Sequence, residues 1–209
     1  MRIMNRDWNV ETKILEVLRD ALKSLMLTQE TIDPVRERMI HVSREISVMI
    51  RNGFKMIYKG EYNKLDSQIK IINSKIVDVM ATLREDEYDI LSRILYDPLK
   101  EYVELILLYS IVSRDSSLLS YIGEIDPRIV LDGYVDLMGE LLRLVQKAIS
   151  DSNCMEALKI IQLCEEIYME FYISQIGNYL YRDHKRKSDR MRSILERVKS
   201  DYIYGCVGR

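Results

Sequence analysis

The sequence predicts an all-α protein, a single domain over residues 1–209 built as a bundle of about seven mostly long, antiparallel helices. The chain has only 8 Gly and 3 Pro, the residues that helix interiors tolerate least. Leu, Ile, Met, Glu, Lys and Arg dominate, and these side chains lose little rotamer freedom in a helix. Apolar and polar residues nowhere alternate long enough to indicate a strand.

Each element is bounded by capping and breaking residues. Asp33-Pro34 and Asp126-Pro127 each indicate an N-cap followed by proline at the first helical position. Asp97-Pro98 leaves two alternatives, a further helix start or a kink within a longer helix. Gly60 marks a stop. The expected helices cover residues 8–28, 34–58, 62–82, 85–114, 127–150, 154–176 and 180–202, with a short turn around 116–122 and a frayed tail from Tyr204.

Composition and charge narrow the classes of protein. The 47% apolar content excludes a disordered chain, and no uncharged run reaches the ~18 residues of a membrane span. No apolar leader of the secretory type is visible at the start. With 31 Lys+Arg against 33 Asp+Glu, nucleic-acid binding would have to come from local patches. Long helices this apolar carry more apolar surface than one layer buries, which predicts a homo-oligomer larger than a dimer.

The cysteines indicate the compartment. Cys154, Cys164 and Cys206 are odd in number and lack C-x-x-C spacing. We therefore expect neither a disulfide framework nor a zinc knuckle, and a reducing cytoplasm fits best.

A first acidic pair lies in a buried helix. Glu101 and Glu104 are three residues apart, so they share the face that continues through Leu105 and Leu108. Like charges at the edge of an apolar seam are costly unless a cation compensates them. The alternative is that they form the solvated end of a buried helix.

A second acidic pair follows on another helix. Asp136 and Glu140 are four residues apart and share a face. Gly139, inside the helix, costs about 1 kcal/mol relative to Ala, which indicates close approach of another helix or a ligand. The alternative is an ordinary polar stripe in which Glu140 pairs with Arg143.

Together the two pairs place four carboxylates on two helices. Such a set suits Mg²⁺, with Mn²⁺ as a substitute, because hard cations take oxygen ligands and substrate phosphates. A metal held this way supports phosphodiester cleavage. A di-iron bundle would need Glu-x-x-His repeats, which His41 and His184 do not supply.

These segments resemble the translin/TRAX family. Leu99-Lys100-Glu101-Tyr102-Val103-Glu104 is similar to L-Q-E-Y-V-E of translin-associated factor X (TRAX), its catalytic subunit. The run from Gly133 to Arg143, GYVDLMGELLR, resembles G-V-A-D-L-T-G-E-L-M-R, differing at Tyr134, Val135 and Met138 among others. A less specific match runs from Glu37 to Ile46, ERMIHVSREI against E-R-L-V-K-L-S-R-D-I. The matches keep their order over roughly residues 35 to 145.

The resemblance implies a translin-like fold, a closed hollow oligomer such as an octamer, and Mg²⁺-dependent endoribonuclease sites that face its interior. The metal-binding acids of the family carry over onto Glu101, Glu104, Asp136 and Glu140. Translin, the non-catalytic partner, has arginine and phenylalanine at the first pair, so both glutamates indicate the catalytic branch. The chain lacks the long insertion of eukaryotic TRAX, which suggests a compact prokaryotic, archaeal relative assembled from one chain type.

Two basic regions are candidates for phosphate contacts. Helix 34–58 carries one, and the run 182–192, flanked by Tyr179 and Tyr181, is the other. The alternative for both is a solvated helix face. Arg93, two helical turns before Glu101, stands at the same offset as an arginine of the TRAX motif. The predicted RNA-binding residues are Arg93, Arg36, His41, Arg44, Arg51, Lys185 and Arg186.

The function expected from the sequence is Mg²⁺-dependent cleavage of single-stranded RNA. The alternative is a non-catalytic shell that binds single-stranded RNA or DNA, as translin does. Arg36 and His41 also fit the loose R-x4-H pattern of metal-independent HEPN ribonucleases, a spacing that an arginine-rich chain meets easily by chance.

Overall fold

The structure, a computed structural model, describes residues 8–207, without the side chains of residues 8, 9, 11, 85, 86 and 88–92. Residues 1–7 and 208–209 of the expected domain lie outside it. The all-α prediction is confirmed, since the described residues form helices and no strand. The elements are α1 (Trp8–Lys59), α2 (Tyr62–Ala81), α3 (Glu85–Ser113), the 3₁₀ helix η1 (Ser117–Ile122), α4 (Pro127–Ser150), α5 (Cys154–Ile173), α6 (His184–Tyr202) and the π-helical turn η2 (Ile203–Val207).

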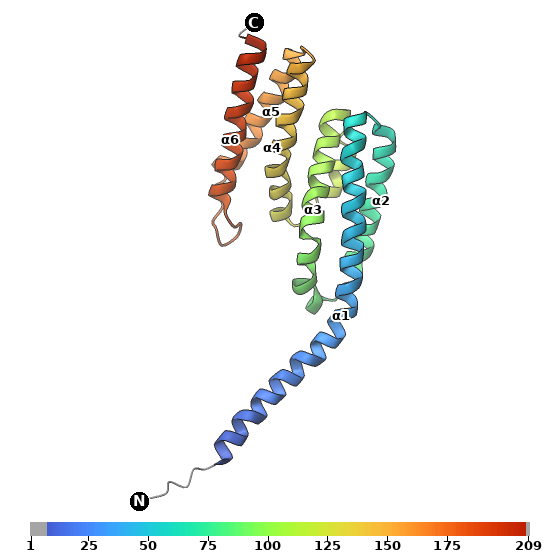
Figure 1. Cartoon of the computed structure of the whole chain (residues 1–209), viewed down its shortest axis with the longest axis vertical. Helices are drawn as coiled ribbons and strands as arrows, with labels where there is room; N and C mark the ends of the chain where they lie inside the picture. Colours follow the sequence, from blue (N-terminus) through green and yellow to red (C-terminus); the bar gives the residue numbers. More distant parts are fainter. Residues whose placement is uncertain (1–7, 208–209) are drawn as a thin grey trace, which may run out of the picture.

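The helices form two groups that stand side by side (Figure 1). One group packs α1 and α2 against α3, and the other packs α5 and α6 against α4. The contact between α3 and α4 joins the groups, and one apolar core runs through both. The start of α1 and the end of α6 lie at opposite ends of the molecule (Figure 1).

The expected break at Asp33-Pro34 is wrong, because α1 continues through Pro34 for 52 residues. Proline removes one hydrogen bond to the carbonyl four residues earlier. Here that carbonyl belongs to the exposed Glu30, where water can reach it, and the apolar stripe continues beyond it. Figure 1 shows α1 bending where it leaves the bundle, the usual effect of an internal proline.

The other boundaries follow their caps more closely. Asp126 caps α4 by accepting from the backbone N–H of Arg128, with Pro127 at the first position. Of the alternatives at Pro98, a position within one long helix is the observed one. Gly60, with φ +71°, ends α1 in the left-handed region that glycine favours. The last expected helix begins at His184 and not at 180, because Asp183 takes φ +60°.

The cysteine prediction is wrong at two positions. Cys154 and Cys206 form a disulfide with a Cα–Cα distance of 5.8 Å, and Cys164 is free and buried. The bond ties η2 to the start of α5, so the tail is not frayed as expected. A disulfide also removes the argument for a reducing compartment that the cysteine spacing provided.

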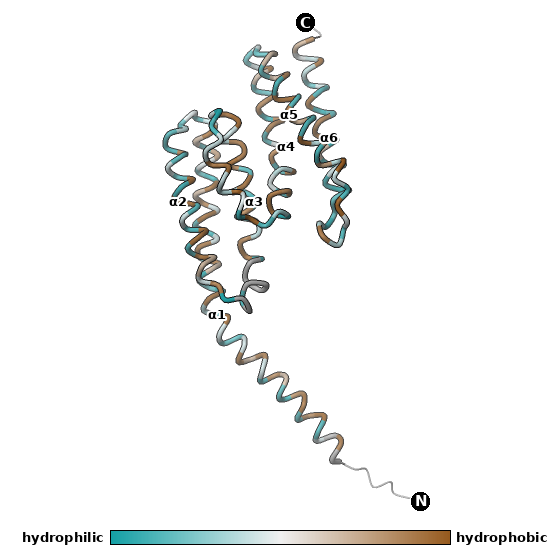
Figure 2. The backbone as a smooth tube through the Cα atoms, turned by 180° about the vertical axis from the view of Figure 1, so that it is seen from behind, coloured by the Kyte–Doolittle hydropathy of each residue, from teal (hydrophilic) through white to brown (hydrophobic). Residues whose placement is uncertain are grey.

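The N-terminal part of α1, residues 10–31, extends beyond the bundle as an arm (Figure 1). Its large apolar side chains are all at least 48% exposed, and the arm of the tube in Figure 2 alternates between hydrophobic and hydrophilic positions. They are Val10, Ile14, Leu15, Val17, Leu18, Leu22, Leu25, Met26 and Leu27. No other segment of residues 8–207 covers them. No helix among residues 8–207 is both long and apolar enough to cross a bilayer.

The disulfide generates a stability prediction. Closing a loop across 52 residues stabilises the folded state by up to about 4 kcal/mol through lost entropy of the unfolded chain. We expect a reductant to lower the melting temperature of the native protein. The double variant Cys154→Ser/Cys206→Ser should melt at that lower temperature with or without the reductant. Equal melting of the native protein in both conditions would contradict the bond.

Candidate active site

Helix α4 crosses α3 at Gly133, and this crossing assembles the site. A Cβ at Gly133 would lie 2.5 Å from Cγ1 of Val103 on α3, so only glycine allows this approach. Val103 stands between Glu101 and Glu104, and Asp136 lies three residues after Gly133. The crossing therefore brings the two predicted acidic pairs onto facing helices.

Gly139 behaves differently from the expectation. A Cβ there would meet nothing within 4 Å, so close approach of another helix is wrong at this position. The space beside Gly139 is open. The other expectation, that a ligand approaches this glycine, stays a prediction. Gly133 is the glycine that the helix packing requires.

Glu104 is the acid with the strongest perturbation. Burial raises its pKa to about 7, and the charges of Asp136, Glu140 and Glu101 raise it in the same direction. No hydrogen bond or ion pair reaches Glu104 from the described residues. A mostly buried carboxylate among three others is thus left without a direct partner.

Glu101 lies closer to cations. Burial raises its pKa, while the charges of Lys100 and Arg51 act in the opposite direction. Arg51, predicted to bind RNA, therefore lies near the acids, and the predicted basic face of α1 reaches the site at this residue.

Asp136 and Glu140 already have cationic partners. Lys100 lies 2.9 Å from Oδ2 of Asp136, and Arg190 of α6 lies 3.1 Å from its Oδ1. Glu140 is buried and accepts hydrogen bonds from Tyr58 and, at 2.5 Å, from Arg143. The predicted alternative in which Arg143 pairs with Glu140 is thus observed.

The four carboxylates supply the oxygen ligands that a hard divalent cation prefers. Their side chains, however, do not converge on one position for such a cation in the described residues. All four groups are carboxylates, and a cation would relieve the repulsion that raises the pKa of Glu104. Within residues 8–207, as far as side chains are described, no three His, Cys, Asp or Glu converge closely enough to hold a metal. Asp136 would have to exchange its cationic partners for the metal. Ligation by the four acids stays a prediction.

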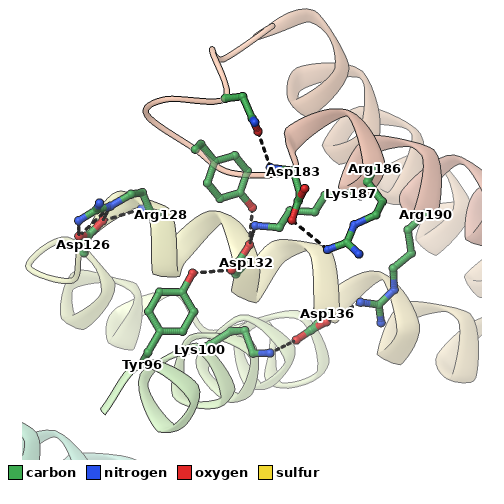
Figure 3. A network of polar contacts seen from close by, with 12 residues as sticks. Tyr96, Lys100, Asp126, Arg128, Asp132, Asp136, Asp183, Arg186, Lys187 and Arg190 are labelled. Atoms are coloured by element: carbon green, nitrogen blue, oxygen red, sulfur yellow. Dashed lines mark hydrogen bonds and ion pairs between the residues drawn. The ribbon is translucent and has the colours of Figure 1, made fainter. Parts of the chain in front are cut away.

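Sequence reasoning missed Asp132, which joins three segments one turn before Asp136. It accepts hydrogen bonds of 2.5 Å from Tyr96 of α3 and from Tyr181 of the loop before α6, and it pairs with Lys187 (Figure 3). Burial acts to raise its pKa, yet these three contacts lower it below the ordinary value. The spacing of four residues to Asp136 was the available signal.

The predicted RNA-binding residues lie in several separate places. Arg36 and His41 sit on the exposed face of α1 and pair with their neighbours Glu37 and Glu45. Arg44 is also exposed there. Arg93 lines a pocket with Tyr96, and Arg186 lines another with Asp136. Lys185 lies in a third, away from the acids. The predicted set is therefore not brought together as one surface.

Comparison with known proteins supports the translin/TRAX resemblance. No family model matches the chain. An uncharacterised protein of Methanocaldococcus jannaschii is 29% identical over 201 residues, covering 91% of this chain and 85% of that protein. The crystal structure of AfC3PO, also solved as a complex with duplex RNA, matches 90% of this chain and 98% of its own with a TM-score of 0.74 and 25% identity. The structure of apo-NeC3PO matches 88% and 96% with a TM-score of 0.71 and 20% identity.

The fold is therefore the translin-like all-α fold. These solved neighbours are C3PO chains of the translin/TRAX type, from Archaea.

The raised pKa of Glu104 predicts how stability depends on pH without metal. The folded protein keeps a proton that the unfolded chain has released, so unfolding becomes easier as the pH rises from about 4.5 to 7. The loss reaches about 3 kcal/mol at most. Urea unfolding in EDTA at pH 5 and pH 8 measures it. Glu104→Gln should reduce this loss, whereas the exposed Glu166→Gln should not; an unchanged loss in Glu104→Gln would contradict the assignment.

Proposed function

We propose that this chain is the subunit of a hollow homo-oligomer that cleaves single-stranded RNA with Mg²⁺, and that Mn²⁺ can substitute. The observation that supports it best is Glu104, unpartnered and raised in pKa among three other acids. Both glutamates of the first pair are present, which favours the catalytic TRAX-like branch. AfC3PO, the similar protein solved with duplex RNA, supports RNA as the substrate.

Glu101, Glu104, Asp136 and Glu140 would hold the metal in this proposal. When bound, the metal would lower the pKa of water and offset negative charge at the phosphate. A bound cation would favour the charged form of Glu104 and so lower its pKa from the value of about 7 that burial and the neighbouring acids give it. Lys100 and Arg190 stand beside Asp136 as cations for a phosphodiester. Tyr58 and Arg143 hold Glu140 in orientation.

The oligomer is proposed because the arm of α1 exposes apolar side chains that no other described segment of the chain covers. A closed shell, such as an octamer, would cover these side chains and enclose the acids. A flexible single strand can bend to an enclosed site where a stiff duplex cannot. AfC3PO was solved with a duplex, so the rate of cleavage, and not binding, is the measurement that separates the two substrates. We place the protein in the cytoplasm, where RNA is available.

A second candidate function is a non-catalytic shell that binds single-stranded RNA or DNA. It is favoured by the cations that already occupy Asp136 and Glu140, and by the separation of the acids within the described residues. Labelled single-stranded RNA incubated with the protein in Mg²⁺ or in EDTA decides between the two. Cleavage only in Mg²⁺, faster than that of a blunt duplex of the same sequence, supports the nuclease.

The acids generate the central prediction. Glu101→Gln, Glu104→Gln and Asp136→Asn should each reduce cleavage by about 100-fold or more, because each removes a negative charge at the metal. Glu140→Gln should cost less, about 10-fold, since Tyr58 and Arg143 still orient the side chain. Rates on labelled RNA measure this.

The matched control is Glu166→Gln, which makes the same chemical change at an exposed position of α5. Circular dichroism and light scattering establish that each variant keeps its helices and its assembly. Full activity of Asp136→Asn would exclude the assigned acids.

The arm generates a prediction about assembly. Static light scattering should report a particle larger than a dimer at micromolar concentration. Leu18→Gln/Leu22→Gln/Leu25→Gln should reduce its size, because these residues recur on one face of the helix at spacings of four and three.

The control variant Glu16→Gln/Asp20→Asn/Lys23→Gln has the same spacing on the opposite face and should keep the native size. A stable monomer of the native protein would contradict the shell.

A further inference from the structure

A basic pocket lies directly beside Asp136, between α3, α4 and α6. It has a volume of about 340 Å³ and is lined by Lys100, Arg186, Lys187 and Arg190 against Asp132 and Asp136. The cations outnumber the carboxylates, and the exposed guanidinium of Arg186 pairs with Asp183, which does not line the pocket (Figure 3). This excess of positive charge suits a phosphate, whose contacts with Arg and Lys do not depend on sequence.

A larger groove adjoins this pocket and shares Lys187 with it. Its volume is about 1060 Å³, and its lining includes the rings of Tyr96, Tyr121, Tyr179 and Tyr181 together with Arg93 and Arg182. Tyrosine rings interleaved with arginines are the surfaces on which unpaired bases stack. The groove is large enough for a nucleotide.

Tyr179 is the ring best placed to stack. It is 89% exposed, yet its edge rests on Gly177, where a Cβ would come within 2.6 Å of the ring. The glycine thus lets the edge of the ring approach the backbone of the loop closely. A large exposed aromatic side chain held in this way is poised for a ligand.

Asp132 and the residues that contact it lie between the two cavities and connect them. Asp132 holds Tyr96, Tyr181 and Lys187 together, and the ammonium of Lys187 lies 3.9 Å from the centre of the Tyr181 ring (Figure 3). Lys187 faces both cavities. The path runs from the tyrosines to Asp136.

We propose that the tyrosine-lined groove and the basic pocket together form the binding site for a single RNA strand, bases in the groove and a phosphate in the pocket. The choice of RNA as the ligand of this site rests on the proposed function. The site would guide the RNA strand to the acids. It assigns a binding role to Tyr179, Arg182, Lys187 and Arg190, and joins Arg93 and Arg186 to one surface.

The test measures binding of labelled single-stranded RNA to the full-length protein in EDTA, where cleavage does not enter. Tyr179→Ala should weaken binding by about 10-fold through lost stacking. Arg186→Gln should lower the slope of log K against log salt by about 0.7, the value for one phosphate contact on a single strand.

The matched controls are Tyr204→Ala and Arg197→Gln, exposed positions that line neither cavity. They should bind with native affinity and salt slope. Circular dichroism establishes folding of all four variants. Native binding by both Tyr179→Ala and Arg186→Gln would overturn the site.

The outcome is separable from that of the nuclease proposal. If the native protein binds RNA through this groove but never cleaves it in Mg²⁺, the site stands and the nuclease proposal fails. If the native protein cleaves RNA while the groove variants bind it normally, the site fails and the nuclease proposal stands.

Discussion

The missing side chain at Gly133 is the constraint on which the candidate site depends. Without a Cβ there, the backbone of α4 lies directly against Val103 of α3. Glu104 on α3 and Asp136 on α4 flank this contact. The negative charge of Asp136 consequently raises the pKa of Glu104. The same contact joins the two groups of helices, so the packing that forms the core also positions the acids.

Charge is distributed unevenly around that contact. Asp132, Asp136 and Glu140 each have a cation within ion-pair distance, supplied by α3, α4 or α6. Burial and the charges of neighbouring acids raise the pKa of Glu104 to about 7. An ordinary folded domain would replace such a group with an apolar one, because burying an unpaired carboxylate is costly. Its presence indicates a role that outweighs stability.

The sequence correctly predicted features that depend on residues close to one another in the chain. The cap at Asp126 and the stop at Gly60 lie where the sequence placed them, because each acts on its own backbone. The break at Pro34 was wrong because water, which a pattern does not show, can satisfy the freed carbonyl. The bond between Cys154 and Cys206 and the contacts of Asp132 depend on the folding together of distant segments, which spacing along the chain does not encode.

The bare arm of α1 has a consequence for how this protein matures. Most of the stability of a helix in a protein comes from the packing of its apolar face against other segments. The arm, which no other described segment covers, is therefore stabilised by a molecule that binds to it. This stabilisation increases with the concentration of that molecule. Newly made chains would thus pass through a stage in which the bundle is formed and the arm is not. If the covering molecule is a second copy of the chain, as proposed, the concentration of the protein sets the fraction of chains whose arm is ordered.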